Sequence, residues 1–155
     1  MSVLPRVLYV DDDVENGQMM TFWIREECGF DIAVAVDGAE AFRLIDTEFF
    51  DLFLLDYCLP DVTAVTLCEK IRERYPDAPI AIYSALDREI DKQRALAAGA
   101  DLYMVKPDDL DKVRPFLKKH LDRRTVMAGK PGPSERDTAV FQRHQRSRFK
   151  PAGIV

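Results

Sequence analysis

Long apolar runs are absent from this 155-residue chain, and none approaches the roughly 20 residues that a membrane-spanning helix needs. The first ten residues, MSVLPRVLYV, also lack the charged start, the extended apolar stretch and the small-residue cleavage site of a secretory signal peptide. Both absences argue against a membrane protein or a secreted one. We therefore expect a cytoplasmic protein without a membrane partner.

Cysteine is also scarce. The three cysteines, Cys28, Cys58 and Cys68, are odd in number, and no two of them have the spacing of a metal site or a redox pair. We expect three reduced thiols that pack as small apolar groups.

The charge of the chain is unevenly distributed. The whole chain carries −5, but from Leu121 onward eight Lys or Arg residues face three acidic ones, which gives +5 for this segment and −10 for the remainder. The segment is rich in Gly, Pro, Ser and Arg and has no sustained periodicity, apart from a possible short helix near Thr138–Arg146. We expect one domain over residues 1–122 and a basic, disordered tail over residues 123–155.

Five short apolar runs alternate with segments of helical periodicity, a pattern that predicts an α/β fold: a five-stranded parallel sheet with helices on both faces. The expected strands are Arg6–Val10, Asp31–Val36, Leu52–Leu55, Ile80–Tyr83 and Leu102–Val105. The expected helices are Val14–Cys28, Ala39–Thr47, Val65–Tyr75, Arg88–Ala98 and Asp109–Leu121.

Glycine and proline mark several of the expected helix ends. Gly29 and Gly99 stand where a left-handed cap would follow a helix, and Pro76 follows the third helix. Pro115 lies inside the last helical segment and removes a backbone hydrogen bond there. We expect that helix either to kink or to begin late.

Acidic, hydroxyl and ammonium side chains follow four of the five predicted strands. In such a sheet, ligands bind beyond the carboxyl ends of the strands, so these side chains are expected to meet. They are Asp11, Asp12 and Asp13 after the first strand, Asp56 after the third, Ser84 after the fourth and Lys106 after the fifth.

This set of residues suits phosphoryl transfer. Clustered carboxylates repel one another, and a hard divalent cation such as Mg²⁺ relieves the repulsion. Asp56 can attack phosphorus to form an acyl phosphate, and the cation, Lys106 and the Ser84 hydroxyl can balance the charge of the transferred group. Taken singly, a strand-end Asp could be a helix cap, Ser84 a turn residue and Lys106 a solvated lysine. Their order along successive strands favours a functional site.

Four sequence motifs carry these residues: VLYVDDD, FDLFLLDYCLPD, IAIYSA and AAGADLYMVKP. They resemble the acidic pair, the phosphoacceptor strand and loop, the Ser/Thr switch and the lysine-proline motif of the response-regulator receiver family of two-component signalling. The resemblance covers about Val7 to Leu121. It implies a CheY-like, flavodoxin-like (βα)₅ fold with strand order 2-1-3-4-5, and a phosphoacceptor signalling domain rather than an enzyme.

The resemblance also implies a role for individual residues. Asp56 would accept the phosphoryl group from a sensor histidine kinase or a histidine phosphotransfer protein. Asp11, Asp12 and Asp56 would hold Mg²⁺ together with the backbone carbonyl of Cys58.

A switch is implied in the same way. Ser84 would hydrogen bond to the phosphoryl group and move on activation, and Tyr103 would be the aromatic residue that then rotates inward. Lys106 would pair with the phosphoryl oxygens or with Asp56, and its bond to Pro107 is expected to be cis. A downstream protein partner, or a second copy of the chain in a homodimer, would detect the change.

The sequence departs from the family pattern at several places. The family usually has Gly where Ala64 stands, which predicts a reshaped turn. Cys58 replaces commoner residues beside the acceptor, and Pro115 disturbs a helix that many receivers use to dimerise. The chain shows no output domain, so we expect a stand-alone receiver.

Two other functions fit parts of the pattern. In a haloacid-dehalogenase-type phosphatase, Asp11 would be the nucleophile, Asp13 the acid/base and Asp108–Asp109 the final acidic pair, but Asp56 would then have no role. A receiver-like scaffold that works without phosphorylation would not need the complete set of site residues. The basic tail suggests nucleic acid, but no recognition-helix pattern supports that partner.

Overall fold

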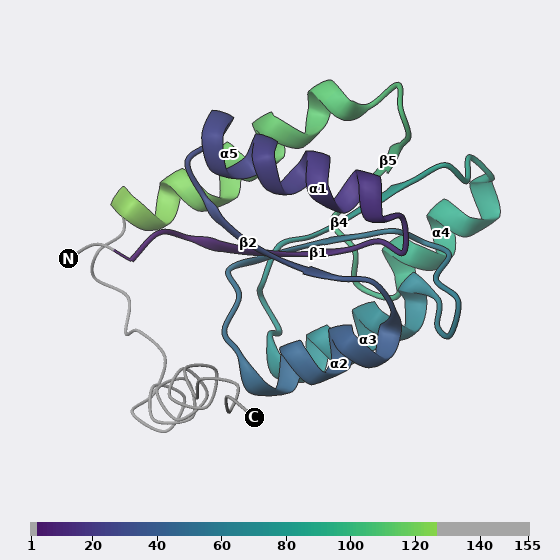
Figure 1. Cartoon of the computed structure of the whole chain (residues 1–155). Coiled ribbons are helices and arrows are strands. Elements are labelled where there is room, and N and C mark those ends of the chain that lie inside the picture. The colour runs from purple at the N-terminus through teal and green to yellow at the C-terminus, as the bar shows by residue number, and fades with distance from the viewer. Residues whose placement is uncertain (1–2, 127–155) are drawn as a thin grey trace, which may run out of the picture.

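Residues 3–126 are described by a computed structural model, with side chains up to Asp122. The predicted tail beyond residue 126 lies outside the described residues. The elements alternate along the chain from β1 to α5 (Figure 1). They are β1 (Arg6–Val10), α1 (Val14–Phe22), the π-helical turn η1 (Trp23–Glu27), β2 (Asp31–Ala35), α2 (Gly38–Thr47), β3 (Leu52–Leu55), α3 (Ala64–Arg74), β4 (Ile80–Ser84), α4 (Glu89–Ala97), β5 (Leu102–Val105) and α5 (Leu110–Val126).

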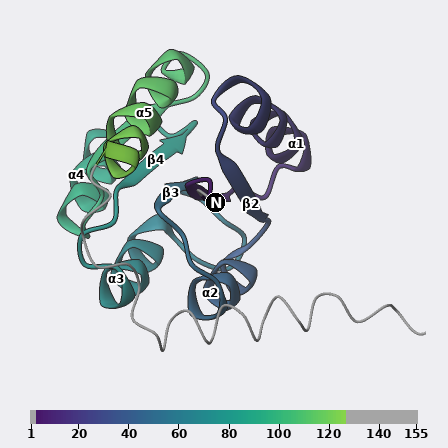
Figure 2. The same cartoon turned by 90° about the vertical axis from the view of Figure 1, so that its left-hand side faces the viewer.

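The five strands form one parallel sheet in the order β2-β1-β3-β4-β5, which confirms the predicted fold. Helices α1 and α5 cover one face of the sheet, and α2, α3 and α4 cover the other (Figures 1 and 2). Within residues 3–126, no helix has the length and apolar character needed to cross a bilayer.

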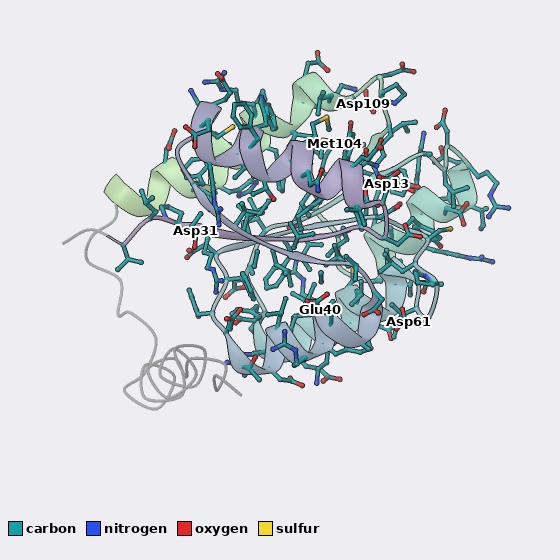
Figure 3. The ribbon with its side chains drawn as sticks, in the orientation of Figure 1. Asp13, Asp31, Glu40, Asp61, Met104 and Asp109 are labelled. Atoms are coloured by element: carbon teal, nitrogen blue, oxygen red, sulfur yellow. The ribbon has the colours of Figure 1, made fainter. Side chains whose placement is uncertain are left out.

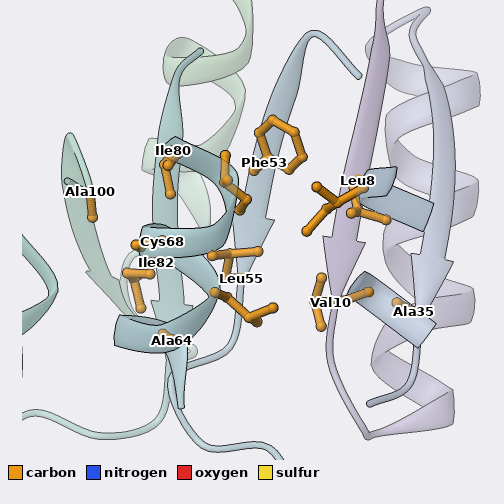
Figure 4. Close-up of a cluster of buried hydrophobic side chains, with 14 of the residues drawn as sticks. Leu8, Val10, Ala35, Phe53, Leu55, Ala64, Cys68, Ile80, Ile82 and Ala100 are labelled. Carbon is orange, nitrogen blue, oxygen red and sulfur yellow. The ribbon is translucent and has the colours of Figure 1, made fainter. Parts of the chain in front are cut away.

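Strand side chains alternate between two buried cores because successive residues of a strand point to opposite faces. Leu8 and Val10 of β1 enter the core beneath α2 and α3, together with Phe53 and Leu55 of β3 (Figure 4). Val7 and Tyr9, which alternate with Leu8 and Val10 along β1, enter the core beneath α1 and α5. This two-sided burial explains why the strands are continuous apolar runs in the sequence.

Helix ends agree with most of the expected signals. Gly29 and Gly99 have φ angles of 75° and 117°, the left-handed conformation expected after the first and fourth helices. The first helix, expected to be one α-helix to Cys28, instead changes to the π-helical turn η1 after Phe22, where the Cys28 amide donates to the Trp23 carbonyl.

The last helix begins at Leu110 and continues through Pro115 to Val126, five residues beyond the end expected from the sequence. Pro115 is exposed, so the carbonyl that it leaves without its usual donor lies on the solvent side of the helix. The turn before α3 also forms without the family's glycine. Ala64 is the first residue of that helix, and its amide donates to the Tyr57 carbonyl at 3.0 Å.

The loop between β3 and α3 is fastened to the start of α2 by Asp61. Its two carboxylate oxygens accept from the backbone amides of Gly38 at 2.7 Å and Ala39 at 3.0 Å. A carboxylate at a helix N-terminus satisfies free amides and interacts favourably with the helix dipole. This contact holds the loop that follows Asp56.

We expect Asp61→Ala to lower the free energy of unfolding by about 1 kcal/mol, because two helix amides lose their acceptor. Asp46→Ala is the matched control, since Asp46 is exposed and its carboxylate pairs with Lys70 at the surface. Its effect should stay within about 0.5 kcal/mol. Denaturant titration measures both, and equal losses in the two variants would contradict the proposed cap.

Candidate functional site

The backbone ladder of the sheet continues one residue past several strands and fixes the residues that follow them. The Asp11 amide donates to the Ala35 carbonyl at 3.0 Å, and the Asp56 amide donates to the Val10 carbonyl at 2.8 Å. The Lys106 amide donates to the Ser84 carbonyl at 2.8 Å. Strand pairing therefore sets the relative positions of the acidic residues and the lysine before any side-chain contact forms.

Acidic side chains gather at this end of the sheet. Asp13, Asp61 and Asp109 lie around it, whereas Asp31 lies at the opposite end (Figure 3). At the same end of the sheet, carboxylate oxygens of Asp11, Asp12 and Asp56 lie within 4.8 Å of one another. Asp11 is buried, Asp56 is half-buried and Asp12 is exposed. Such a set of oxygen ligands, open to solvent on one side, fits a hard divalent cation such as Mg²⁺.

Lys106 inserts its ammonium group among these carboxylates. The Nζ atom lies 2.6 Å from Asp11 Oδ2 and 3.5 Å from Asp56 Oδ2. It also lies 5.4 Å from the centre of the Tyr83 ring, which adds a cation–π contact. Lys106 is thus paired more closely with Asp11 than with Asp56, the predicted acceptor.

The two buried carboxylates differ in their electrostatics. Burial raises the pKa of Asp11, but hydrogen bonds from Lys106, Tyr9 and the Asp13 amide outweigh it and hold this pKa below its usual value. Burial also raises the pKa of Asp56, and there Ser84 and Lys106 only partly offset it. Asp11 is thus the firmly ionised anchor of Lys106, while Asp56 is the more basic carboxylate.

Ser84 and Tyr103 lie next to Asp56, the predicted acceptor. Ser84 is 2% exposed, and hydrogen bonding to its hydroxyl lowers the pKa of Asp56. The Tyr103 hydroxyl donates to the Leu86 carbonyl at 2.7 Å, in the loop that follows β4. Its ring packs against Tyr57, with the ring centres 6.3 Å apart. Tyr103 therefore contacts the loop that follows Ser84, the last residue of β4.

The remaining candidates have simpler surroundings. Asp13 caps α1, because its carboxylate accepts from the Asn16 amide at 3.0 Å. Cys58 is exposed, and its backbone pairs with Thr63 across the loop. Burial and the nearby Asp56 charge raise the pKa of the Cys58 thiol. The peptide bond between Lys106 and Pro107 is cis.

Sequence reasoning missed one residue that touches the site, Tyr9, and one buried acid beside it, Asp91, which hydrogen bonds to Tyr57. Tyr9 donates from its hydroxyl to Asp11 Oδ2 at 2.5 Å, and burial together with Asp11 raises the pKa of Tyr9 above its usual value. Tyr9 precedes Asp11 by two residues on one strand, so the strand period could have placed both on the same face. Asp91 of α4 is 1% exposed, and its carboxylate lies 2.6 Å from Arg88 Nε. No signal in the sequence distinguishes Asp91 from its neighbours.

Comparison with known proteins identifies the family of the chain. The model of the response regulator receiver domain family matches residues 7–118, and the chain belongs to this family. The alkaline phosphatase synthesis transcriptional regulatory protein PhoP of Bacillus subtilis (strain 168) is 34% identical over 123 residues, which is 79% of this chain and 51% of that protein. The chain thus spans about half the length of this relative.

Solved structures give the same result. The receiver domain of the Francisella response regulator 1452 is 33% identical, with a TM-score of 0.69 over 77% of this chain and 98% of that one. The receiver domain of sensor histidine kinase PA1611 from Pseudomonas aeruginosa PAO1 has a TM-score of 0.68 over 77% of this chain and 99% of that one. At 23% identity it supports the fold alone, and its own structure has a magnesium ion coordinated in the active site cleft.

Removal of the Lys106 ammonium should destabilise the metal-free protein, because Asp11 is then left buried without its cation. We expect Lys106→Ala to lower the free energy of unfolding by about 3 kcal/mol at neutral pH. Lys70→Ala, which removes an exposed pair with Asp46, should change it by less than about 0.5 kcal/mol.

The loss of stability in Lys106→Ala should depend on pH. Because the pKa of Asp11 is lowered by folding, the contribution of the pair is present above the unfolded pKa of roughly 4. It is lost as the pH falls through the lowered value in the folded state. The difference between parent and Lys106→Ala should therefore shrink in acid. A difference that is constant from neutral to acid pH would contradict this assignment.

Proposed function

We propose that this receiver domain accepts a phosphoryl group on Asp56 from a histidine kinase or a histidine phosphotransfer protein, in an Mg²⁺-dependent reaction. The observation that carries the proposal is the position of Asp56, half-buried between two other carboxylates, the Lys106 ammonium and the Ser84 hydroxyl. The result is a switch that a downstream protein partner detects, not the turnover of a substrate.

The residues of the site have distinct roles in this reaction. A carboxylate oxygen of Asp56 forms a bond to phosphorus while the bond from phosphorus to the leaving atom of the donor breaks and takes its electron pair. The Lys106 ammonium balances charge on the phosphoryl oxygens, and the Ser84 hydroxyl donates a hydrogen bond to one of them. Later attack of water at phosphorus returns Asp56 to a carboxylate and releases phosphate.

The acidic cluster would hold the metal ion. Asp11, Asp12 and Asp56 would supply carboxylate oxygens. The backbone carbonyl of Cys58, two residues after Asp56, would complete the protein ligands. When bound, Mg²⁺ supplies positive charge that offsets the repulsion among the carboxylates and the phosphoryl oxygens.

The phosphatase alternative finds less support in the geometry. Its nucleophile, Asp11, is 1% exposed and engaged by four hydrogen-bond donors. Its acid/base, Asp13, is the cap of α1. Asp109 is occupied too, by the Val105 amide at 2.8 Å and by Lys112 at 2.7 Å. The scaffold alternative has no use for a complete site.

The face formed by α4, β5 and α5 would carry the signal. Tyr103 of β5 links it to the loop after β4, and two exposed apolar residues of α4, Ile90 and Leu96, offer contact area to a partner. The same face would serve a second copy of the chain in a homodimer. We propose a protein partner rather than nucleic acid.

Labelling by a small phosphodonor tests the acceptor. With Mg²⁺ present, we expect the chain to gain one phosphoryl group, which is released by base as an acyl phosphate is, and Asp56→Asn should abolish it. Asp108→Asn, an exposed residue outside the cluster, is the control and should label normally. Mass spectrometry measures the adduct. Labelling that survives in Asp56→Asn but not in Asp11→Asn would instead favour the phosphatase.

The switch is tested with Ser84→Ala. Phosphorylation adds about −1.5 to −2 charges beside the Ser84 hydroxyl, and the new oxygens should draw that hydroxyl toward them and release Tyr103 from its present contacts. We expect Ser84→Ala to accept the phosphoryl group but to show at least twofold smaller amide shift changes over α4 and β5 when beryllofluoride is added. Changes equal to those of the parent would disprove the coupling.

A further inference from the structure

Tyr9 is a buried phenol whose position joins the core to the site. It lies on β1, is 0% exposed, and packs among apolar residues of the core beneath α1 and α5, such as Met20, Ile24 and Leu54. Its hydroxyl donates to Asp11 Oδ2 at 2.5 Å. A buried hydroxyl needs such a partner, and the close packing around the ring leaves it little freedom to move away.

Asp11 Oδ2 is shared among three donors. Besides Tyr9, it accepts from Lys106 Nζ at 2.6 Å and from Asn16 Nδ2 at 3.3 Å. The other oxygen, Oδ1, accepts from the Asp13 amide at 2.9 Å. The three donors to Oδ2 differ in mobility, because Tyr9 is fixed in the core whereas Lys106 has a long flexible side chain that is 14% exposed.

We infer that Tyr9 is a positioning residue for phosphoryl acceptance: its hydroxyl keeps Asp11 hydrogen-bonded when Lys106 leaves it for the phosphoryl group on Asp56. The inference deepens the proposed function and rests on it.

Phosphorylation of Asp56 would require Lys106 to move. It is 2.6 Å from Asp11 and 3.5 Å from Asp56, so pairing with a phosphoryl group on Asp56 draws it away from Asp11. Loss of a short hydrogen bond at a buried carboxylate oxygen is costly, and without Tyr9 only the longer one of the three, from Asn16 Nδ2 at 3.3 Å, would remain on Oδ2. With Tyr9 in place, Oδ2 keeps a short hydrogen bond throughout. Without the Tyr9 hydroxyl, Asp11 would hold Lys106 more tightly, and moving Lys106 to the phosphoryl group would cost more free energy.

Tyr9→Phe is the test, because it removes the hydroxyl and keeps the ring. With a small phosphodonor and Mg²⁺, we expect phosphorylation about tenfold slower than in the parent, since a hydrogen bond to a charged group is worth roughly this factor. Tyr75→Phe is the matched control. It also removes a hydroxyl from a buried phenol, one that donates to the Glu48 carbonyl at 3.0 Å in the opposite core, and it should leave the rate within about twofold.

A second measurement separates positioning from a loss of stability. In metal-free protein, NMR follows the exchange of the Lys106 ammonium protons with water. Tighter pairing with Asp11 in Tyr9→Phe should slow this exchange severalfold, whereas Tyr75→Phe should not change it. A general loosening of the fold would accelerate it.

The outcomes distinguish the inference from the proposed function. A parent chain that accepts no phosphoryl group on Asp56 would overturn both. If the parent is labelled and Tyr9→Phe matches it in rate, or if the Lys106 protons of Tyr9→Phe exchange as fast as or faster than those of the parent, the inference alone is wrong. Slower labelling together with slower exchange supports it.

Discussion

Electrostatic repulsion is the constraint around which this molecule is organised. Carboxylate oxygens of Asp11, Asp12 and Asp56 lie within 4.8 Å of one another, and two of these residues are largely withdrawn from water. Such an arrangement is unfavourable unless a positive charge is present. Lys106, which follows β5 and is far from Asp11 in the sequence, provides one at 2.6 Å from Asp11 Oδ2. The Lys106 ammonium therefore offsets part of the repulsion among the three carboxylates.

The sheet makes this arrangement possible without strain in the strands themselves. Parallel pairing brings the carboxyl ends of all strands to one edge, and the order β2-β1-β3-β4-β5 puts β1 beside β3. Asp11 and Asp56 are neighbours for that reason. The repulsive carboxylates are held by backbone hydrogen bonds and by two apolar cores, so the stability of the fold offsets the cost of the site.

Most of the fold could be predicted from the sequence because it depends on local patterns. Strands buried on both faces appear as apolar runs, and all five were located within a residue at each end. The cap at Gly29 and the residues gathered at the strand ends were equally local. The path of the last helix could not be predicted from local patterns, because the effect of Pro115 depends on whether it lies on the exposed or the buried side of the helix.

The second layer of the site escaped prediction for a related reason. A tyrosine in an apolar strand usually signals only packing, and whether its hydroxyl meets a carboxylate depends on the exact depth of the ring. The burial of Asp91 depends on how α4 lies over the loop after β3, and the sequence of α4 does not specify that packing. Motifs thus identify the residues gathered at the strand ends, while tertiary packing determines which groups support them.

The two cores hold the site from opposite sides. On the side of α3 and α4, Ser84 hydrogen bonds to Asp56, and the Tyr103 ring packs against Tyr57, the residue after Asp56. Tyr9 holds Asp11 from the other core, beneath α1 and α5, where no mobile element is needed. A conformational switch needs this asymmetry, because one part of the fold must stay in place while the other changes between two arrangements. Under the proposed function, a core that stays fixed beneath α1 and α5 would direct the change that follows phosphorylation of Asp56 toward α4 and β5.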